Sequence, residues 1–284
     1  MSELLIGLTL VGFGTSTPEL VTSIDAALRG SPGIALGNVL GSNIGNIFLI
    51  LALVLIVRPI QVNPNAVRRD GVLAILASLA LAAIGLMFGA VDRLVGGLLV
   101  TALAMYLICV WRTESRGGAA SAMHQQGAHA HDPAPGSLVV SALFALGGLA
   151  LLVWGADLLV VGAIAIARGS GISETVIGLT IVAIGTSLPE LVATLVAALK
   201  GRADVAFGNI VGSNLYNILG ILGVTALVHP IAVPVDVGVF DWAVMVGSAI
   251  LLALFALTGR RLSRVEGLAL LAMYGLYVGA LFAR

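Results

Sequence analysis

A stretch of this chain occurs twice. Residues 5–62 align with residues 176–233 at a constant shift of 171 and without a gap. The first copy contains GFGTSTPELV and GNVLGSNIGN, and the second contains AIGTSLPELV and GNIVGSNLYN. What repeats is polar: a Thr-Ser-x-Pro-Glu segment and a ladder of Asn and Ser, each inside an apolar stretch. The carboxylate occurs in both copies, and a charged group in apolar surroundings costs free energy. Its presence in both copies therefore indicates a function.

Composition indicates a membrane protein. Hydrophobic residues make up 59% of the chain, charged residues make up 10%, and the mean hydropathy is +1.11. A soluble domain carries roughly 25% charged residues. The formal net charge of zero argues against a nucleic-acid partner. The single cysteine, Cys109, excludes an internal disulfide.

Nine hydrophobic segments are long enough to span a bilayer, which takes about 20 residues. No segment alternates with a period of two residues as the strands of a membrane barrel do, so we expect an all-α polytopic membrane protein. The expected helices are 3–29, 33–57, 68–90, 92–111, 137–166, 174–199, 204–229, 236–258 and 264–282.

The two copies are expected to have opposite orientations in the membrane. Five crossings separate their first helices, an odd number, and such inverted repeats are typical of secondary transporters with a site at the midplane. The expected organisation is a first repeat, a polar linker and a second repeat, at 1–111, 112–136 and 137–284. Three irregularly spaced histidines of the linker are not predicted to bind a metal: His124, His129 and His131.

The distribution of Lys and Arg between the loops predicts the orientation of the chain in the membrane. Alternating the loops between two sides places ten of these residues on one side and the remaining four on the other. The first group is Arg58, Arg68, Arg69, Arg112, Arg116, Lys200, Arg202, Arg260, Arg261 and Arg264, and the second is Arg29, Arg93, Arg168 and Arg284. We therefore expect a plasma (inner) membrane protein with a cytoplasmic linker and an outside C-terminus.

The first repeat is expected to lack its leading helix. The second repeat is preceded by the helix predicted at 137–166, but nothing equivalent precedes the first, and Met1 aligns with Ile172. Two five-helix repeats would result if a further helix lay upstream of Met1. An in-frame apolar segment in the upstream coding sequence would support this expectation, and a stop codon there would count against it.

Glu19 and Glu190 are the repeated acids. A charged residue at mid-bilayer costs about 2.5–3.5 kcal/mol on insertion scales. Neither repeat supplies a Lys or Arg at matching depth, so we expect a bound cation or proton as the counter-charge. The alternative, a protonated Glu that bonds two helices together, is less favoured because the acid occurs twice.

Hydroxyls are expected on the same helix face as each Glu. Thr15 and Ser16 precede Glu19 by four and three residues, and Thr186 and Ser187 precede Glu190 likewise. In the same turns, proline leaves a glycine carbonyl without its normal partner. These residues are Pro18 with Gly14 and Pro189 with Gly185. Carboxylate, hydroxyl and carbonyl oxygens suit a hard cation such as Ca²⁺, and Na⁺ would also be accepted.

A second polar element follows each Glu. Four-residue spacing predicts one polar stripe at Asn38, Ser42 and Asn46 and another at Asn209, Ser213 and Asn217. Adjoining small residues would allow close helix contact, at Gly37, Gly41, Gly45, Gly208 and Gly212. The alternative is that these Asn and Ser only join helices. Asn43 and Asn214 lie off the stripes and are assigned to packing or helix-end hydrogen bonds.

The remaining polar and aromatic residues are given structural interpretations. Asp157 is expected to bond a neighbouring helix rather than line an ion path. Four other acids are expected near helix ends, at the membrane interface: Asp25, Asp204, Asp236 and Asp241. Three aromatic residues are expected as interface anchors: Tyr106, Trp111 and Trp242.

At its paired GTSxPE and GNxxGSNxxN segments the chain resembles the cation/Ca²⁺ exchanger superfamily, in its prokaryotic sodium/calcium exchanger branch. The resemblance implies a ten-helix transporter with four clustered cation sites. It also implies these ligands: Thr15, Ser16, Glu19 and the Gly12 carbonyl; Thr186, Ser187, Glu190 and the Ala183 carbonyl; and Ser42, Asn46, Ser213 and Asn217. Some family members carry Asp where this chain has Asn217, which by resemblance argues against potassium dependence.

Na⁺/Ca²⁺ antiport by alternating access is therefore the expected function, with a Ca²⁺/H⁺ antiporter as the alternative. Ca²⁺ and Na⁺ are the expected cargo and the lipid bilayer the expected surroundings, with no cofactor and no obligate protein partner. Any charge imbalance between the exchanged ions would make transport voltage-sensitive. An intramembrane enzyme is disfavoured because no His lies deep in a predicted helix, and the inverted symmetry disfavours a cation sensor that does not transport.

Overall fold

The computed structural model is a bundle of helices, and it describes all residues except 1–10, 63–66, 117–137, 260 and 284. The first half of the chain contains the helices α2 Gly12–Thr15, α3 Thr17–Leu28, α4 Pro32–Gly45, α5 Ala52–Val57, α7 Val72–Phe88 and α8 Arg93–Arg116, with the π-helical segments η2 Asn46–Leu51 and η3 Val67–Gly71.

The second half continues with a longer series. Its helices are α10 Leu138–Ser170, α11 Glu174–Ile177, α12 Ala183–Thr186, α13 Leu188–Leu199, α14 Ala203–Leu215, α15 Leu222–Val228, α16 Val239–Gly259 and α17 Arg264–Phe282. Its π-helical segments are η4 Gly178–Val182 and η5 Tyr216–Ile221.

Most of the predicted membrane helices are present. Among the described residues, six helices are long and apolar enough to cross a membrane, or seven if one bent pair counts as a single span. They lie at 32–57, 67–88, 93–112, 203–228, 239–258 and 264–282, with the bent pair at 174–199. The helix predicted at 137–166 is α10, and the segment predicted at 3–29 begins outside the described residues. The total of nine stays a prediction.

The predicted linker begins later than the sequence suggests. Helix α8 continues to Arg116, into the first residues of the segment 112–136. The three linker histidines lie outside the described residues.

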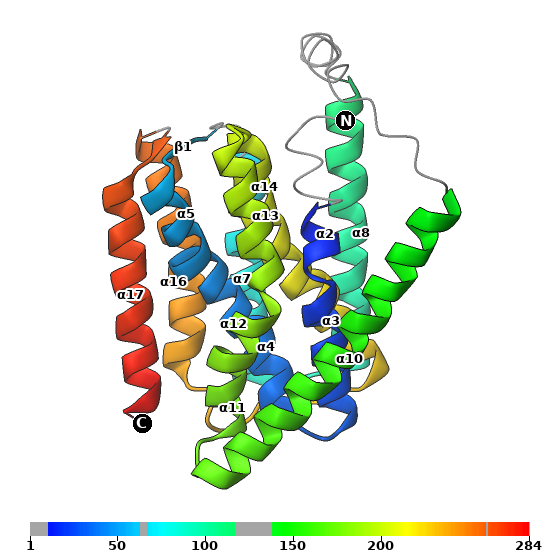
Figure 1. Ribbon diagram of the computed structural model, residues 1–284. Coiled ribbons are helices and arrows are strands. Elements are labelled where there is room, and N and C mark those ends of the chain that lie inside the picture. The colour runs from blue at the N-terminus through cyan, green and yellow to red at the C-terminus, as the bar shows by residue number, and fades with distance from the viewer. Residues whose placement is uncertain (1–10, 63–66, 117–137, 260, 284) are drawn as a thin grey trace.

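The corresponding segments of the two repeats run in opposite directions. In Figure 1, α2 and α3 descend while α11, α12 and α13 ascend. Two short antiparallel ribbons close the ends of the bundle: β1 Ile60–Gln61 with β4 Arg261–Leu262, and β2 Ala90–Val91 with β3 Ile231–Ala232. Each strand of one ribbon matches a strand of the other at the shift of 171. The repeat therefore extends beyond the aligned residues 5–62.

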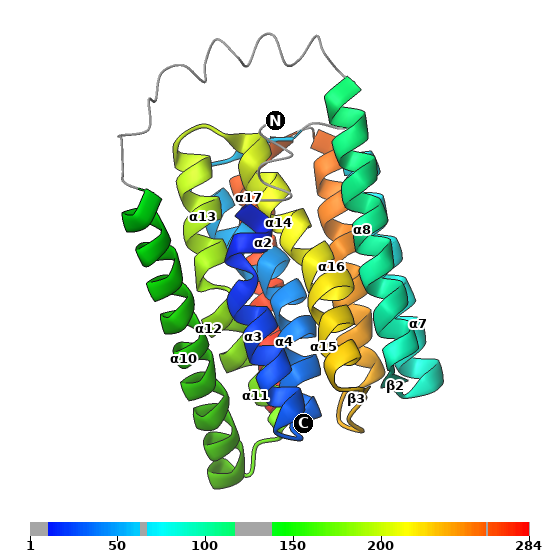
Figure 2. The same cartoon turned by 90° about the vertical axis from the view of Figure 1, so that its right-hand side faces the viewer.

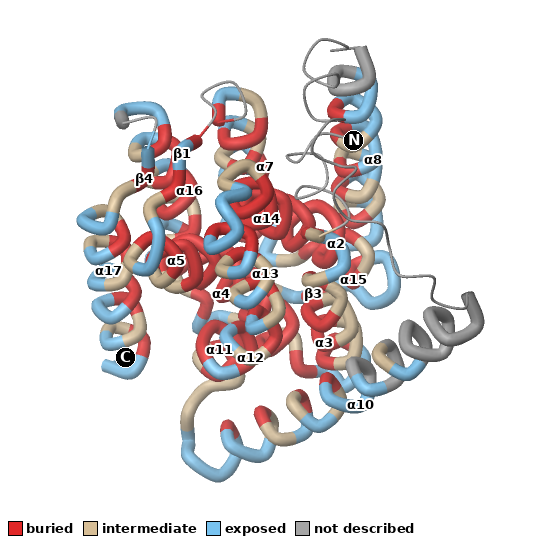
Figure 3. The backbone as a smooth tube through the Cα atoms, turned by 45° about the horizontal axis from the view of Figure 1, so that its top comes forward, coloured by how far each residue is buried: buried red, intermediate tan, exposed pale blue. Residues whose placement is uncertain are grey.

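Helices α4 and α14 form the centre of the bundle and are buried along most of their length (Figure 3). The predicted small-residue contact is confirmed at two glycines. A Cβ added to Gly37 would lie 3.0 Å from the Gly178 Cα, and one added to Gly41 would lie 2.5 Å from the Leu179 carbonyl oxygen. At Gly45 a Cβ would meet nothing within 4 Å. The close approach therefore lies where α4 crosses η4.

Outer helices lie on both sides of this centre. Figure 2 shows α10 along one edge and α7 with α8 along the other. The prediction that Asp157 bonds a neighbouring helix is confirmed, because it forms an ion pair with Arg29 at the end of α3. Arg29 also pairs with Asp25 at 2.7 Å.

Two of the three predicted interface anchors are wrong. Trp242 is 1% exposed, and its ring fills the space beside Gly85 where a Cβ would clash at 2.4 Å. Tyr106 is also buried, and its hydroxyl bonds the buried carboxylate of Asp70. Trp111 is 62% exposed, as an anchor would be. Asp241 does lie near a helix end, but it is completely buried rather than interfacial.

Candidate cation-binding site

Each Glu helix breaks just before its proline. Ser16 and Ser187 end the short helices α2 and α12 with ψ angles of 6° and 9°, and α3 and α13 start at the following residues. The axis bends by 45° at the second break. The proline lacks the N–H that would continue the helix. The sequence-based expectation of a broken helix is therefore confirmed in both copies.

The two Glu side chains are held by serines of the opposite repeat. The Ser16 hydroxyl donates to Oε1 of Glu190 at 2.9 Å, and the Ser187 hydroxyl donates to Oε1 of Glu19 at 2.9 Å. All four side chains are at most 3% exposed. The predicted shared face of serine and Glu stays a prediction, and the structure adds that each serine bonds the Glu of the other repeat. The exchange of partners brings both acids to one place.

The threonines also reach across the two repeats. Thr186 donates to Oδ1 of Asn38 at 3.0 Å, and Thr15 lies 3.5 Å from Oδ1 of Asn209. The amide of Asn38 in turn donates to the backbone carbonyl of Glu19 at 3.2 Å. These Asn side chains therefore position the broken helices against the central ones.

Ser42 and Asn46 of the first polar stripe lie at the same site. The Ser42 hydroxyl is 3.1 Å from that of Ser187. Nδ2 of Asn46 donates to Oδ1 of Asn214 at 3.0 Å, and Nδ2 of Asn214 donates to the Asn43 carbonyl at 3.3 Å. Asn214 thus joins α14 to the first stripe, whereas its sequence position off the stripe suggested packing or a helix-end hydrogen bond.

Several buried polar atoms of the site have no hydrogen-bond partner among the described residues. They are Oε2 of Glu19, Oε2 of Glu190, Oδ1 of Asn46, Oγ of Ser213 and both amide atoms of Asn217. Buried polar groups are nearly always satisfied, so each exception needs an explanation. Five of these six atoms are oxygens, the kind of ligand atom that a hard cation prefers.

The two backbone carbonyls implied as ligands keep helical partners. The Gly12 carbonyl accepts from the Ser16 amide and the Ala183 carbonyl from the Ser187 amide, both at 3.1 Å. Each carbonyl oxygen has two lone pairs, and each also lies 3.3 Å from a threonine hydroxyl of its own repeat, Thr15 for Gly12 and Thr186 for Ala183. No group of three or more His, Cys, Asp or Glu suited to a metal occurs in the described part of the chain. Any cation here would depend on two carboxylates together with neutral oxygens.

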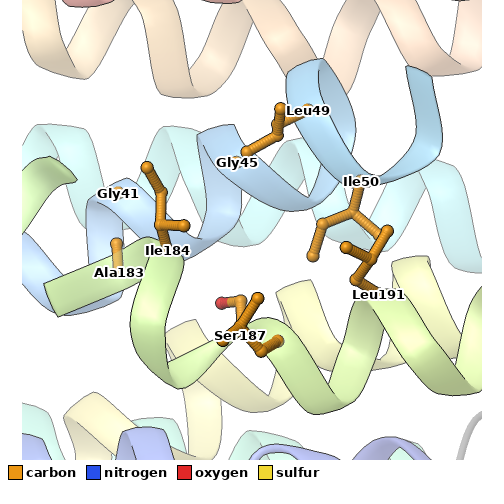
Figure 4. Close-up of a pocket in the computed structure, with 9 residues that line it drawn as sticks. Gly41, Gly45, Leu49, Ile50, Ala183, Ile184, Ser187 and Leu191 are labelled. Carbon is orange, nitrogen blue, oxygen red and sulfur yellow. The ribbon is translucent and has the colours of Figure 1, made fainter. Parts of the chain in front are cut away.

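Two cavities flank the site at equivalent positions of the repeats. One, of about 30 Å³, lies beside Ser187 and is bounded by Gly45, Leu49 and Leu191 (Figure 4). The other, of about 100 Å³, lies beside Ser16 and is bounded by Tyr216 and Gly220. A site of about 10–15 Å³ on this measure holds one water. Both cavities are therefore large enough for water next to the serines that hold the acids.

A second symmetric pair of acids was not anticipated. Asp70 accepts from the Tyr106 hydroxyl at 3.1 Å, and Asp241 accepts from the Tyr277 hydroxyl at 3.3 Å. Both acids and both tyrosines are related by the shift of 171. Extending the sequence alignment past residue 62 would have revealed the pairs. They tie η3 to α8 and α16 to α17.

Comparisons with known proteins agree with this architecture. A family model described as sodium/calcium exchanger protein matches residues 1–112 and 140–283. The sodium/calcium exchanger MaX1 of Methanosarcina acetivorans is 32% identical over 99% of this chain and 89% of that protein. The inner membrane protein YrbG of Escherichia coli is 37% identical over 88% of this chain and 77% of that protein.

A solved structure has the same fold. The sodium-calcium exchanger NCX_Mj, soaked with Na⁺ and Sr²⁺, aligns with a TM-score of 0.72 and 33% identity over 98% of this chain and 87% of that one. The family and the fold support a multi-pass membrane transporter rather than a catalytic enzyme. This chain therefore belongs to the sodium/calcium exchanger family of cation/Ca²⁺ antiporters.

Proposed function

We propose that this chain moves Ca²⁺ across the membrane in exchange for Na⁺, at a site shared by the two repeats. The observation that carries the proposal is the reciprocal pairing of Ser16 with Glu190 and of Ser187 with Glu19. It brings two buried carboxylates together, and each keeps one oxygen without a partner among the described residues. Such a pair is costly unless a cation compensates it.

The chemistry of the surrounding oxygens favours Ca²⁺ and Na⁺. Ca²⁺ takes six to eight oxygen ligands in flexible geometry, whereas Mg²⁺ demands an octahedron and sheds water reluctantly. The proposed ligands are the side chains of Thr15, Ser16, Glu19, Ser42, Asn46, Thr186, Ser187, Glu190, Ser213 and Asn217, with the carbonyls of Gly12 and Ala183. They come from both antiparallel repeats, so a relative movement of the repeats would open the site to one side at a time.

The orientation proposed for transport follows the charge distribution. The end of the bundle that carries Arg58, Arg264 and the end of α8 would face the cytoplasm. Arg58 there donates to the Leu199 carbonyl, and Arg264 donates to the Ile56 carbonyl at 3.0 Å. The end of α17 would then lie outside, in a plasma (inner) membrane.

Ca²⁺ uptake into Na⁺-loaded proteoliposomes at fixed pH tests the proposal. Uptake should require the outward Na⁺ gradient, and Glu19→Gln or Glu190→Gln should abolish it. Glu174→Gln is a matched control because Glu174 lies in the first turn of α11, outside the proposed ligand set. Equal losses in the control and the site variants would contradict the assignment of the site.

A Ca²⁺/H⁺ antiporter is the second candidate. The same unpartnered carboxylate oxygens could bind protons, since no Lys or Arg among the described residues is paired with either Glu. Uptake that ignored the Na⁺ gradient but stopped on addition of a proton uncoupler would favour this candidate over Na⁺ coupling.

A further inference from the structure

The two repeats are joined at one end of the bundle by Arg58. This residue follows the last residue of α5 in the first repeat, and its guanidinium donates to the Leu199 carbonyl at the end of α13 in the second repeat. Its Nη2 atom lies 3.5 Å from the position that a Cβ added to Gly201 would take. The last carbonyls of a helix lack partners within the helix and carry partial negative charge, so a cation stabilises them. Arg58 therefore fastens the helix that carries Glu190 to the other repeat.

The equivalent position at the opposite end of the bundle is His229, between α15 and β3 (Figures 1 and 2). The shift of 171 relates the two residues, and their backbones agree, with φ and ψ of −143° and 112° at Arg58 and −142° and 118° at His229. Each amide donates at 2.8 Å to the carbonyl four residues earlier. Helix α15 packs against α3 as α5 packs against α13. A side chain at position 229 is therefore placed to reach the end of the helix that carries Glu19.

The end of α3 is more open than the end of α13. Gly30 follows α3 in the same left-handed conformation as Gly201 follows α13, with φ angles of 72° and 78°. A Cβ added to Gly30 would meet no described atom within 4 Å. The histidine ring is turned to the Pro230 carbonyl, 3.0 Å from its Nδ1. Because a carbonyl can only accept, Nδ1 carries the proton of the neutral ring, and Nε2 has none to donate.

Protonation supplies the missing donor. A histidinium has two N–H groups, and histidine ordinarily changes its charge between pH 5 and 8. We propose that protonated His229 donates from Nε2 to the Leu28 carbonyl, the equivalent of Leu199, and so joins the two repeats at the end of α3. Arg58 is charged at every working pH. The chain thus has one permanent and one proton-dependent contact between its repeats.

Charged residues lie at this end of both helices that pack against α15. Those of α3 are Asp25 and Arg29, and Arg29 pairs with Asp25 and with Asp157 of α10. Those at the start of α8 are Asp92 and Arg93. The other segments packed there, η5, β2, β3 and α4, contain no charged residue. Three acids against two arginines favour the protonated form of the ring over the neutral one.

Hydrogen exchange tests the contact without transport. The amides at the end of α3, residues 24–31, are followed in lipid nanodiscs for the unmodified chain, His229→Gln and His229→Arg. At about pH 8, His229→Arg should slow their exchange about two- to fivefold relative to the other two. At about pH 5, the unmodified chain should match His229→Arg, and His229→Gln should still exchange faster. An unmodified chain that matches His229→Gln at both pH values overturns the inference.

The reciprocal substitution moves the proton dependence to the other end. Arg58→His should make exchange at the end of α13, residues 195–202, slow at about pH 5 and fast at about pH 8. Arg58→Gln should give fast exchange there at both pH values, and neither variant should affect the end of α3. Slow exchange at the end of α13 in Arg58→Gln would show that the arginine does not hold this helix, which overturns the inference.

The effect on transport rests on the proposed function. Joining the repeats at the end of α3 lowers the fraction of molecules that are open there, which raises the Ca²⁺ concentration for half-maximal flux from that side. In vesicles of uniform orientation acidified on one side at a time, this concentration should rise about two- to fivefold more in the unmodified chain than in His229→Gln. The matched comparison removes any effect of pH on the Glu residues, which both proteins share.

The outcomes separate the inference from the proposed function. Ca²⁺ flux with the same pH dependence in the unmodified chain and in His229→Gln overturns the inference and leaves the proposed function intact. Ca²⁺ flux that is absent from all variants overturns the proposed function, and hydrogen exchange at the end of α3 then decides whether the proton-dependent contact exists.

Discussion

The two polar stripes have the same residue types at equivalent positions but different contacts. At the first stripe, Ser42 lies 3.1 Å from the Ser187 hydroxyl, and Asn46 donates to Asn214. At the second stripe, Ser213 and Asn217 have no side-chain partner among the described residues. The adjoining cavities differ in the same sense, at about 30 Å³ beside the first stripe and about 100 Å³ beside the second.

A few side chains account for this difference. Asn43 turns its amide onto the Val39 carbonyl of its own helix, at 2.7 Å, so it does not reach the other stripe as Asn214 does. Tyr216 occupies the position equivalent to Gly45 and forms an edge-on contact with Phe13 at 5.7 Å. Sequence symmetry thus sets which groups meet at the site. Local side-chain choices decide which of them are free to bind an ion.

Removing either carboxylate should have the largest effect, and the same effect in both repeats. Glu19→Gln and Glu190→Gln each remove one of the two carboxylates that would bind the cation and leave the other buried without a compensating charge. Breaking a buried charge pair costs about 3–5 kcal/mol, so the apparent affinity for Ca²⁺ in flux assays should fall by at least about 100-fold. Losses that differ by more than about tenfold between the two variants would contradict a shared site.

Substitution of the asparagines that position the threonines should have the next largest effect, and the loss of stability should differ between the two. Asn38 bonds Thr186 at 3.0 Å, whereas Asn209 lies 3.5 Å from Thr15. An unsatisfied buried group costs about 1–3 kcal/mol, so Asn38→Ala should lower the free energy of unfolding by about 2 kcal/mol. Asn209→Ala should lower it by about 1 kcal/mol. Thermal unfolding in detergent measures both, and the reverse order would contradict the geometry.

Substitution of Ser42 and of Ser213 by Ala should affect the stability of the protein differently, although both should weaken Ca²⁺ binding. Ser42→Ala removes a contact with Ser187 and should cost about 1 kcal/mol of stability as well as Ca²⁺ affinity. Ser213→Ala removes a hydroxyl without a partner among the described residues. It should weaken Ca²⁺ binding while leaving the unfolding temperature unchanged. A large loss of stability in Ser213→Ala would show that its hydroxyl is already used within the protein.

Much of the site was predictable because its chemistry is repeated. The duplicated motifs identified both Glu residues and the Ser and Asn around them, and the prolines identified the helix breaks. The partner of each serine was not predictable, because the bonds of Ser16 to Glu190 and of Ser187 to Glu19 depend on how the two repeats pack. Trp242 was misplaced because composition cannot tell a ring that packs against a glycine from one at the membrane surface. Such contacts depend on how distant helices meet.

The smallest effects should come from the symmetric Asp–Tyr pairs, which serve as a comparison outside the site. Tyr106→Phe leaves Asp70 bonded to Arg69, and Tyr277→Phe leaves Asp241 bonded to the Gly238 amide. Each should lower the free energy of unfolding by about 0.5 kcal/mol without changing Ca²⁺ affinity. A changed affinity would mean that these pairs also control the site.

The central claim is that Glu19 and Glu190 bind the same ion. Equilibrium binding of radioactive Ca²⁺ to the purified chain, the two single Gln variants and the double variant tests it most directly. A shared ion predicts that each single variant loses tight binding and that the second substitution adds little. Single variants that each retained about half of the bound Ca²⁺ at unchanged affinity, with all of it lost only in the double variant, would contradict the account.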